Sequence, residues 1–320
     1  MSPHMSPDVR SVRTPAVALA LVVLYGGLRV YWELGHMPER MSPIGSDLIV
    51  FTGWAAVGLC AAAAAALVVL MAARPDGPLG WAPPALAWAV GGALIVSGAL
   101  VLLDVVSAVV PGLGMPFSWA GALSKAACVG SGVLLWRSAA AYRRRAAGAC
   151  AACGRRASRV LARTPGWAFA AAYVSVAGCL ARIAAQAAVG FDAVPYRAGA
   201  VAFEIEFLLA GTLLPLALVH RFGRVWPGWV PWLAGRPVPR RLVLWPGAGV
   251  SGGLLAYFGV ALGQMAAERL SGGVPFSGGD LPEAFFWVAV PGYVVWGAGM
   301  AVAAWSYARR TRVACASCGG

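Results

Sequence analysis

Long apolar blocks occupy most of this chain and constrain its fold more than any other feature. Residues 16–31 form one block, interrupted only by Arg29, and residues 49–73 and 82–103 form two more. About 20 consecutive apolar residues span the hydrocarbon core of a bilayer as a helix, because each backbone polar group must be bonded within the segment. A soluble helix would carry a polar face at helical spacing, and these blocks have none. The sequence therefore predicts an all-α integral membrane protein.

The apolar blocks and the distribution of cations together predict a topology. Of the 25 Lys and Arg residues, 18 fall on one side when the N-terminus is placed inside, three fall outside, and four lie within spans. Such a bias identifies the cytoplasmic side, so both termini are expected in the cytoplasm. The abundance of Arg and Ala is typical of a high-GC bacterial genome and therefore indicates the plasma membrane. Eight spans are predicted, at 16–35, 48–73, 84–110, 118–140, 166–188, 201–219, 244–266 and 283–306.

Short motifs recur in the same order in the two halves of the chain. Tyr142 is followed by three arginines and Tyr307 by Ala-Arg-Arg, and a C-x-x-C-G motif begins eight residues after each tyrosine. Arg-Thr-Pro at 13–15 recurs at 163–165, and the offset between matching motifs drifts only from 150 to 165 residues. We interpret this as a duplication that gives two tandem parallel four-helix repeats, each ending in a cytoplasmic CxxCG knuckle. Since four is even, the repeats share one orientation, and their pseudo-two-fold axis is expected along the membrane normal.

The duplication also predicts where the parts of the chain begin and end. The predicted parts are a cytoplasmic N-terminal tail at 1–14, a first four-helix repeat at 15–154, a basic interfacial linker at 155–163 and a second repeat at 164–320.

The segment GGLRVYWELG, at 26–35, resembles uncharacterised multi-pass membrane proteins of high-GC bacteria that carry an aromatic Y-W-x-L-G element in a first span. The resemblance covers this segment alone and implies no particular activity.

Four of the seven cysteines form the two CxxCG motifs, Cys150 with Cys153 and Cys315 with Cys318. Cytosolic thiols are kept reduced, which disfavours a structural disulfide. Two C-x-x-C turns supply the four thiolates of a tetrahedral zinc site, and the pseudo-two-fold axis would bring the knuckles together. The sequence predicts a structural Zn²⁺ that clamps the two halves. A redox-active dithiol, favoured by the neighbouring arginines, and a pair of unliganded tails are the alternatives.

Seven charged residues form a predicted layer in the outer third of the membrane. With a helical rise of about 1.5 Å per residue, their distance from the ends of their spans places them on the order of 5–10 Å below the surface. They are Arg29, Glu33, Asp104, Lys125, Arg182, Glu204 and Glu206. Charges inside spans are rare and costly, so they are candidates for a functional site.

Pairings within the layer follow from helical spacing and from the connecting turns. Arg29 and Glu33 are four residues apart on one face, and Asp104 and Lys125 flank a short outer turn. Arg182 has Gln186 in the position equivalent to Glu33, so we expect Arg182 to reach Glu204 or Glu206. Asp47, at the outer start of the second span, is the residue that could form the corresponding ion pair with Arg29.

Three interpretations of the layer remain open on the sequence alone. The charges are ion pairs that fix helix register, or they line an outward-facing cavity between the halves, or some of them lie in interfacial water. In the second case Arg29 and Arg182 would bind an anionic or zwitterionic group, since the guanidinium fork suits carboxylate and phosphate. The predicted function is then a small-solute or ion transporter or binding protein. The alternative is a non-transporting scaffold or a redox or metal sensor.

The surface loops predict the partners. Trp226, Trp229 and Trp232 recur between Arg clusters in 220–241, and 155–163 is a short basic stretch. Trp and Arg favour the headgroup level, so we expect contact with the bilayer and with anionic lipid headgroups rather than with nucleic acid. The chain contains no P-loop, H-E-x-x-H or G-x-S-x-G motif, so an enzyme is the least supported class.

Overall fold

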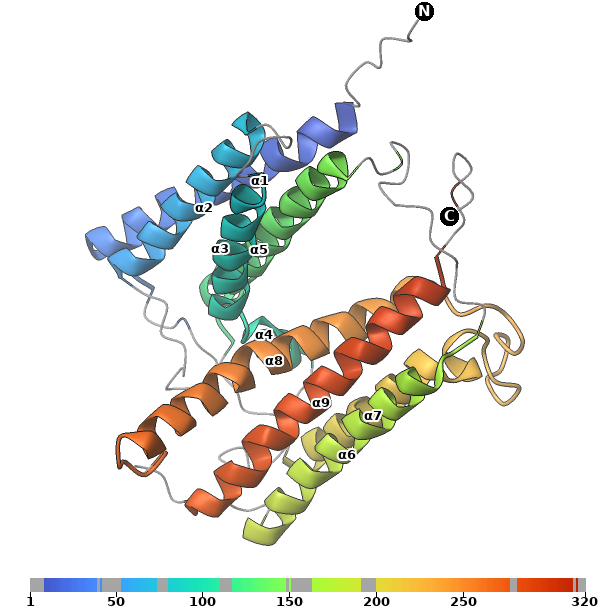
Figure 1. Ribbon diagram of the computed structural model, residues 1–320. Coiled ribbons are helices and arrows are strands. Elements are labelled where there is room, and N and C mark those ends of the chain that lie inside the picture. The colour runs from blue at the N-terminus through green and yellow to red at the C-terminus, as the bar shows by residue number, and fades with distance from the viewer. Residues whose placement is uncertain are drawn as a thin grey trace, which may run out of the picture. The chain divides into compact units, whose positions relative to one another are not determined.

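A computed structural model describes residues 9–38, 41, 53–73, 80–109, 117–147, 150, 163–190, 200–276, 281–312 and 315 (Figure 1). The described residues form helices joined by turns, with no strand among them, which confirms the predicted all-α class. The helices are α1 Val9–Tyr31, α2 Trp54–Ala72, α3 Ala82–Ser97, α4 Val101–Val109, α5 Trp119–Ala146, α6 Gly166–Val189, α7 Ala200–Val219, α8 Arg240–Leu270 and α9 Glu283–Arg310. Trp32–His36 is π-helical and Arg221–Gly223 is a 3₁₀ turn.

Six helical segments are long and apolar enough to cross a bilayer, which indicates a multi-pass membrane protein. They are Thr14–His36, Trp54–Ala72, Ala82–Ala108, Gly166–Val189, Arg240–Leu270 and Glu283–Arg310. The other two predicted spans, 118–140 and 201–219, fall on α5 and α7, helices of 28 and 20 residues. With a rise of about 1.5 Å per residue, both helices are long enough to span a bilayer. The predicted number of eight membrane spans stays a prediction.

The chain divides into two compact units. The first contains α1, α2, α3, α5 and also Cys315, and the second contains α4 from Leu102 onward and α6 to α9. The boundaries expected from the sequence, which place 101–109 in the first repeat and Cys315 in the second, stay a prediction.

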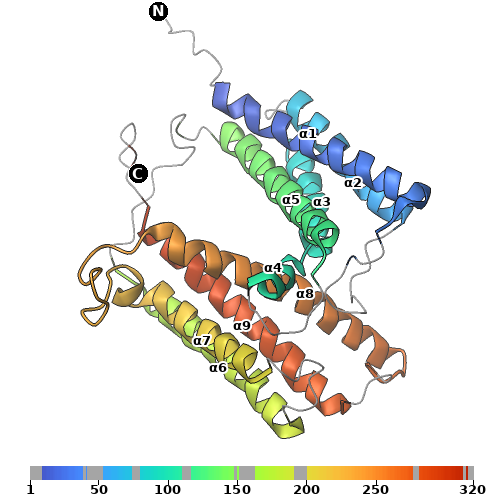
Figure 2. The same cartoon turned by 180° about the vertical axis from the view of Figure 1, so that it is seen from behind.

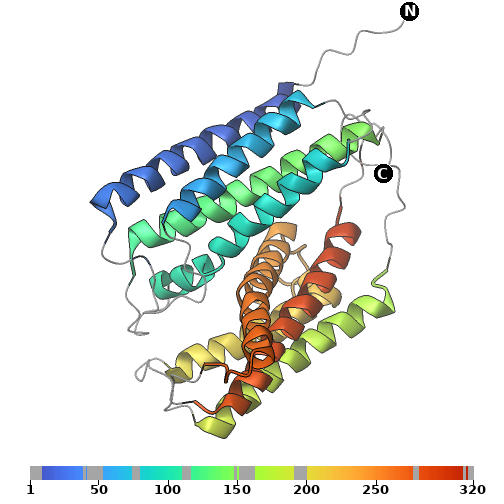
Figure 3. The same cartoon turned by 60° about the vertical axis from the view of Figure 1, so that its left-hand side comes forward.

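In the first unit, α1 packs against α2 and α5, and α3 also packs against α2 and α5 (Figure 3). Val22, Leu67, Leu94 and Leu135 are among the residues that fill the core between them. The backbones of α3 and α5 touch, since a Cβ added at Gly132 would lie 2.6 Å from the carbonyl oxygen of residue 91. Close approach at small residues is the usual packing mode of membrane helices.

In the second unit the same scheme recurs with α6, α7, α8 and α9 in place of α1, α2, α3 and α5 (Figure 2). The first helix packs against the second and the fourth, the third packs against the same two, and the second also contacts the fourth. Here α6 and α9 make the closest contact. A Cβ at Gly178 would lie 2.6 Å from the backbone nitrogen of Trp296, and one at Gly299 would lie 2.4 Å from the carbonyl oxygen of Ala171.

The single helix expected over 84–110 is interrupted between Ser97 and Val101. Ser97 Oγ donates to the carbonyl of Ala93, and the Gly98 N–H contacts the carbonyls of the preceding turn. A Cβ at Gly98 would lie 2.6 Å from the carbonyl oxygen of Lys125, so the break is packed directly on α5. The expected span is therefore built from two helices, α3 and α4.

Candidate functional site

Arg29 is the centre of a buried polar cluster in the first unit. Its side chain projects from α1 and is 4% exposed. Its Nε donates to the Tyr25 hydroxyl at 2.7 Å, and its Nη2 donates to Ser124 Oγ on α5 at 3.1 Å. The two hydroxyls are themselves 2.8 Å apart, and the Cys128 thiol donates to Tyr25 at 3.2 Å. The guanidinium carbon lies 5.3 Å from the ring centres of both Tyr25 and Trp32, within cation–π range.

The third nitrogen of this guanidinium differs from the other two. Arg29 Nη1 is buried and has no hydrogen-bond partner in the described part of the chain. A buried donor without an acceptor is destabilising, by about 1–3 kcal/mol for a neutral group and by more for a charged one. Such groups are rare in native structures, and each calls for a specific explanation.

Glu33 does not form the expected pair with Arg29. Its Oε1 accepts the N–H of Gly53 at 2.9 Å, at the start of α2. The chain turns π-helical at Trp32, and Gly35 has a φ of 104°, so the i, i+4 relation of a regular α-helix is lost at this point. The Glu33 carboxylate thus fixes the α1–α2 connection.

Lys125 and Asp104 are both buried, and each lies in a different unit. Lys125 is on α5, next to Ser124, and its Nζ donates to the carbonyl of Met41 at 2.9 Å. A Cβ added at Gly121 would overlap the same carbonyl oxygen, so the backbone at Met41 packs directly against α5. The expected Asp104–Lys125 pair would join the two units and stays a prediction.

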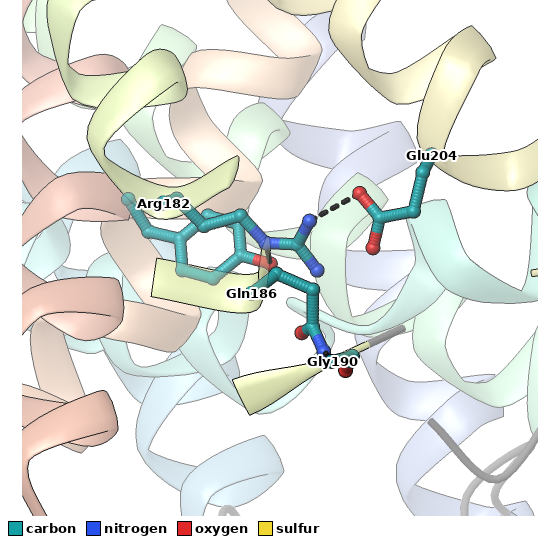
Figure 4. Close-up of polar contacts among 5 residues, drawn as sticks. Arg182, Gln186, Gly190 and Glu204 are labelled. Atoms are coloured by element: carbon teal, nitrogen blue, oxygen red, sulfur yellow. Dashed lines mark hydrogen bonds and ion pairs between the residues drawn. The ribbon is translucent and has the colours of Figure 1, made fainter. Parts of the chain in front are cut away.

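Arg182 is the centre of a second cluster, in the second unit. It projects from α6, is 7% exposed, and its Nη1 forms an ion pair with Oε2 of Glu204 on α7 (Figure 4). Its Nε donates to the Tyr293 hydroxyl on α9 at 2.7 Å. The rings of Phe207 and Tyr293 lie 5.1 and 5.5 Å from its guanidinium carbon. The predicted contact between Arg182 and Glu204 is confirmed.

The two polar neighbours of this pair have other roles. Gln186 Nε2 donates to the carbonyl of Gly190 at 3.0 Å and so closes the C-terminal end of α6 (Figure 4). Glu206 is exposed, because two residues along a helix turn a side chain away from the face that carries Glu204.

The two arginines therefore have closely similar surroundings. Arg29 lies on α1 and Arg182 on α6, which have corresponding places in the two packing schemes. Each arginine is more than nine-tenths buried and donates Nε to a tyrosine hydroxyl at 2.7 Å. Sequence analysis identified Arg29 and Arg182 but neither tyrosine. Tyr25 precedes Arg29 by one helical turn, a spacing visible in the sequence, whereas Tyr293 comes from a distant helix and has no local signal.

Arg310 closes the opposite end of the second unit. It is buried near the end of α9, and it donates to Thr164 Oγ1 at 2.7 Å and to the carbonyl of Leu218 at 2.6 Å. The last carbonyls of a helix lack intrahelical partners, and a cation there is favourable. Arg240, at the start of α8, donates to Thr311 Oγ1 at 2.9 Å. Four helix ends that are expected on the cytoplasmic side thus meet through two arginines.

The cysteine motifs are described only in part. Cys150 and Cys315 are half-buried and both belong to the first unit, whereas Cys153 and Cys318 lie outside the described residues. Within the described ranges, no three His, Cys, Asp or Glu side chains are grouped so that they could hold a metal ion. The four-cysteine zinc site stays a prediction.

The loop between α7 and α8 is held in one conformation by backbone hydrogen bonds. The Trp226 N–H bonds the carbonyl of Arg236 at 3.0 Å, and the N–H of residue 238 bonds the carbonyl of residue 224 at 2.9 Å. Trp229 and Trp232 extend from this loop and are 83% and 91% exposed. The arrangement is compatible with bilayer contact, and contact with particular headgroups stays a prediction.

Comparisons of the chain with models of protein families, with curated proteins and with solved structures find no match.

Proposed function

We propose that this chain is a bacterial plasma-membrane protein, with both termini in the cytoplasm, that binds a small solute or ion at its buried arginine clusters and carries it across the membrane. The observation that supports the proposal most directly is the equivalent placement of Arg29 and Arg182. Their shared surroundings, and the matching helix pairings of the two units, are what a duplicated four-helix unit would give. Many transporters are built from such repeats and bind substrate within the membrane.

A purely structural role explains these clusters less well. An ion pair that only holds helices together is often replaceable by apolar residues without loss of stability. Arg29 also has a buried nitrogen, Nη1, that no described residue satisfies. Guanidinium groups in aromatic surroundings are suited to bind anionic or zwitterionic solutes.

The test is a solute panel on detergent-purified protein, read as ligand-dependent thermal stability and followed by uptake into proteoliposomes. We expect a saturable rise in apparent Tm for at least one organic anion or zwitterion. Uptake should fall at least about tenfold in Arg29→Gln, which corresponds to a loss of about 1.4 kcal/mol. Arg137→Gln is the matched control, since Arg137 is exposed on α5 and should keep full uptake. Binding without uptake would make the protein a receptor, and no binding by any solute would contradict the proposal.

A second proposal concerns the cytoplasmic cysteines. Tyr142 and Tyr307, each eight residues before a CxxCG motif, are both buried at the ends of the corresponding helices α5 and α9. The two motifs thus follow the ends of equivalent helices at the same distance in sequence. This supports the hypothesis that they form one structural zinc site between Cys150, Cys153, Cys315 and Cys318. A non-transporting scaffold, or a redox or metal sensor, is the function that this site would serve if no solute binds.

A further inference from the structure

We propose that Arg29 Nη1 binds the carboxylate of a small organic anion, and that in the second unit the same position is filled by the protein's own Glu204. This inference rests on the proposed function and names the chemical class of its solute. It also assigns different roles to the two units, because Nη1 of Arg29 has no partner among the described residues whereas Nη1 of Arg182 is paired with Glu204.

The two guanidinium groups share one hydrogen-bond partner type and differ at Nη1. Nε donates to a tyrosine hydroxyl at 2.7 Å in both, Tyr25 in one unit and Tyr293 in the other. Nη1 of Arg182 is bonded to the Glu204 carboxylate, whereas Nη1 of Arg29 is buried without a partner in the described residues. The second unit therefore shows which chemical group the first unit lacks.

The surroundings of Arg29 favour one negative charge rather than two. Its contacts include the hydroxyls of Tyr25 and Ser124, the Cys128 thiol and the faces of two aromatic rings. None of these groups is an acid that would balance the guanidinium charge. Lys125, the nearest cation along α5, donates to a backbone carbonyl instead. One guanidinium balances one carboxylate, while a phosphate monoester carries about −1.5 to −2 charges at neutral pH and would leave an excess charge buried.

An internal occupant is the competing explanation. Asp47 lies outside the described residues, and sequence analysis places it at the outer start of the second span, where Glu204 stands in the second unit. An aspartate on Arg29 would make both units self-paired and would leave no ligand site. The experiment must therefore separate an added carboxylate from an internal one.

The experiment titrates detergent-purified wild-type protein with sodium acetate at constant ionic strength and follows apparent Tm. Sodium chloride and sodium phosphate are the parallel titrations. We expect a saturable rise with acetate and none with chloride or phosphate, since only a ligand of the folded state stabilises it. Arg29→Gln should abolish the rise and Arg137→Gln should keep it. If Arg29→Gln does not purify folded, Arg29→Lys keeps the charge without the planar fork and should raise the half-saturating acetate concentration about tenfold or more.

Glu204→Ala supplies an independent readout. It should lower the apparent Tm and should respond to acetate more strongly than the wild type, because Nη1 of Arg182 is then open as well. A wild type that does not respond to acetate overturns the proposal, and a response gained on Asp47→Asn would identify the internal occupant. An equal response to phosphate also overturns it. If the solute panel instead yields a cation or a neutral solute while acetate has no effect, the proposed function stands and the carboxylate assignment is wrong.

Discussion

Replacing Gly178 by Ala tests the backbone contact between α6 and α9. The added Cβ would lie 2.6 Å from the nitrogen of Trp296 and 2.7 Å from the carbonyl oxygen of Gly292. Both are backbone atoms within a helix, so no side-chain rotation relieves the overlap. To bring the carbonyl contact from 2.7 Å to an ordinary 3.4 Å, the two helices must separate locally by about 0.7 Å.

The effect on stability has three contributions, two destabilising and one stabilising. Overpacking a tight interface destabilises by about 1–3 kcal/mol, and alanine in a helix regains up to about 1 kcal/mol over glycine. The same separation would stretch the 2.7 Å bond between Arg182 and Tyr293 beyond hydrogen-bonding range, and a bond to a charged group contributes about 1.5–3 kcal/mol. We expect Gly178→Ala to lower the free energy of unfolding by about 2–4 kcal/mol.

The assay is equilibrium unfolding in mixed micelles, followed by tryptophan fluorescence, since Trp296 is buried at this contact. The matched control is Gly259→Ala on α8, where a Cβ would meet nothing within 4 Å. This control should leave stability unchanged or raise it by up to about 1 kcal/mol. Equal unfolding midpoints for the two variants would refute the close contact between α6 and α9.

Three further predictions concern the side that is expected to face the cytoplasm. Arg310→Gln should lower the free energy of unfolding by about 3 kcal/mol through lost bonds to the last turn of α7. Arg309→Gln is its control in the same unfolding assay and should have little effect. Elemental analysis should find about one zinc per chain, lost in both Cys150→Ser and Cys315→Ser. Zinc retained in either variant would contradict a shared site. Trp232→Ala should reduce the gain in apparent Tm on moving from zwitterionic to anionic lipid nanodiscs, and an unchanged gain would contradict headgroup contact.

Helix positions were largely predictable because a run of apolar residues long enough to span a bilayer has few other folded states. The break at Gly98 was not predicted, although Ser97-Gly98 is visible in the sequence. At Gly98 the carbonyl of Lys125 approaches from another helix and leaves no room for a Cβ. Contacts between distant parts of the chain of this kind have no signature in the local sequence.

The charged residues of the site could be predicted from the sequence, and its uncharged residues could not. Arg182 and Glu204 stand out in apolar surroundings, and their contact follows from similar depth on successive helices. Tyr293 and Ser124 do not stand out, because uncharged hydroxyl side chains are ordinary in such helices and only packing decides which arginine they meet. Regular helical spacing predicted Arg29 as the partner of Glu33, which is wrong. The π-helical turn begins at Trp32, and Glu33 bonds Gly53 instead.

The contact between α6 and α9 has a consequence for synthesis in the cell. The ribosome delivers α6 to the membrane before α9 exists, so Arg182 enters the bilayer without Tyr293. Glu204 arrives on the very next helix, in time to neutralise the arginine while the chain is still growing. The ion pair can therefore form before α9 is made, and completion of α9 adds the Tyr293 hydroxyl and the backbone contact with α6.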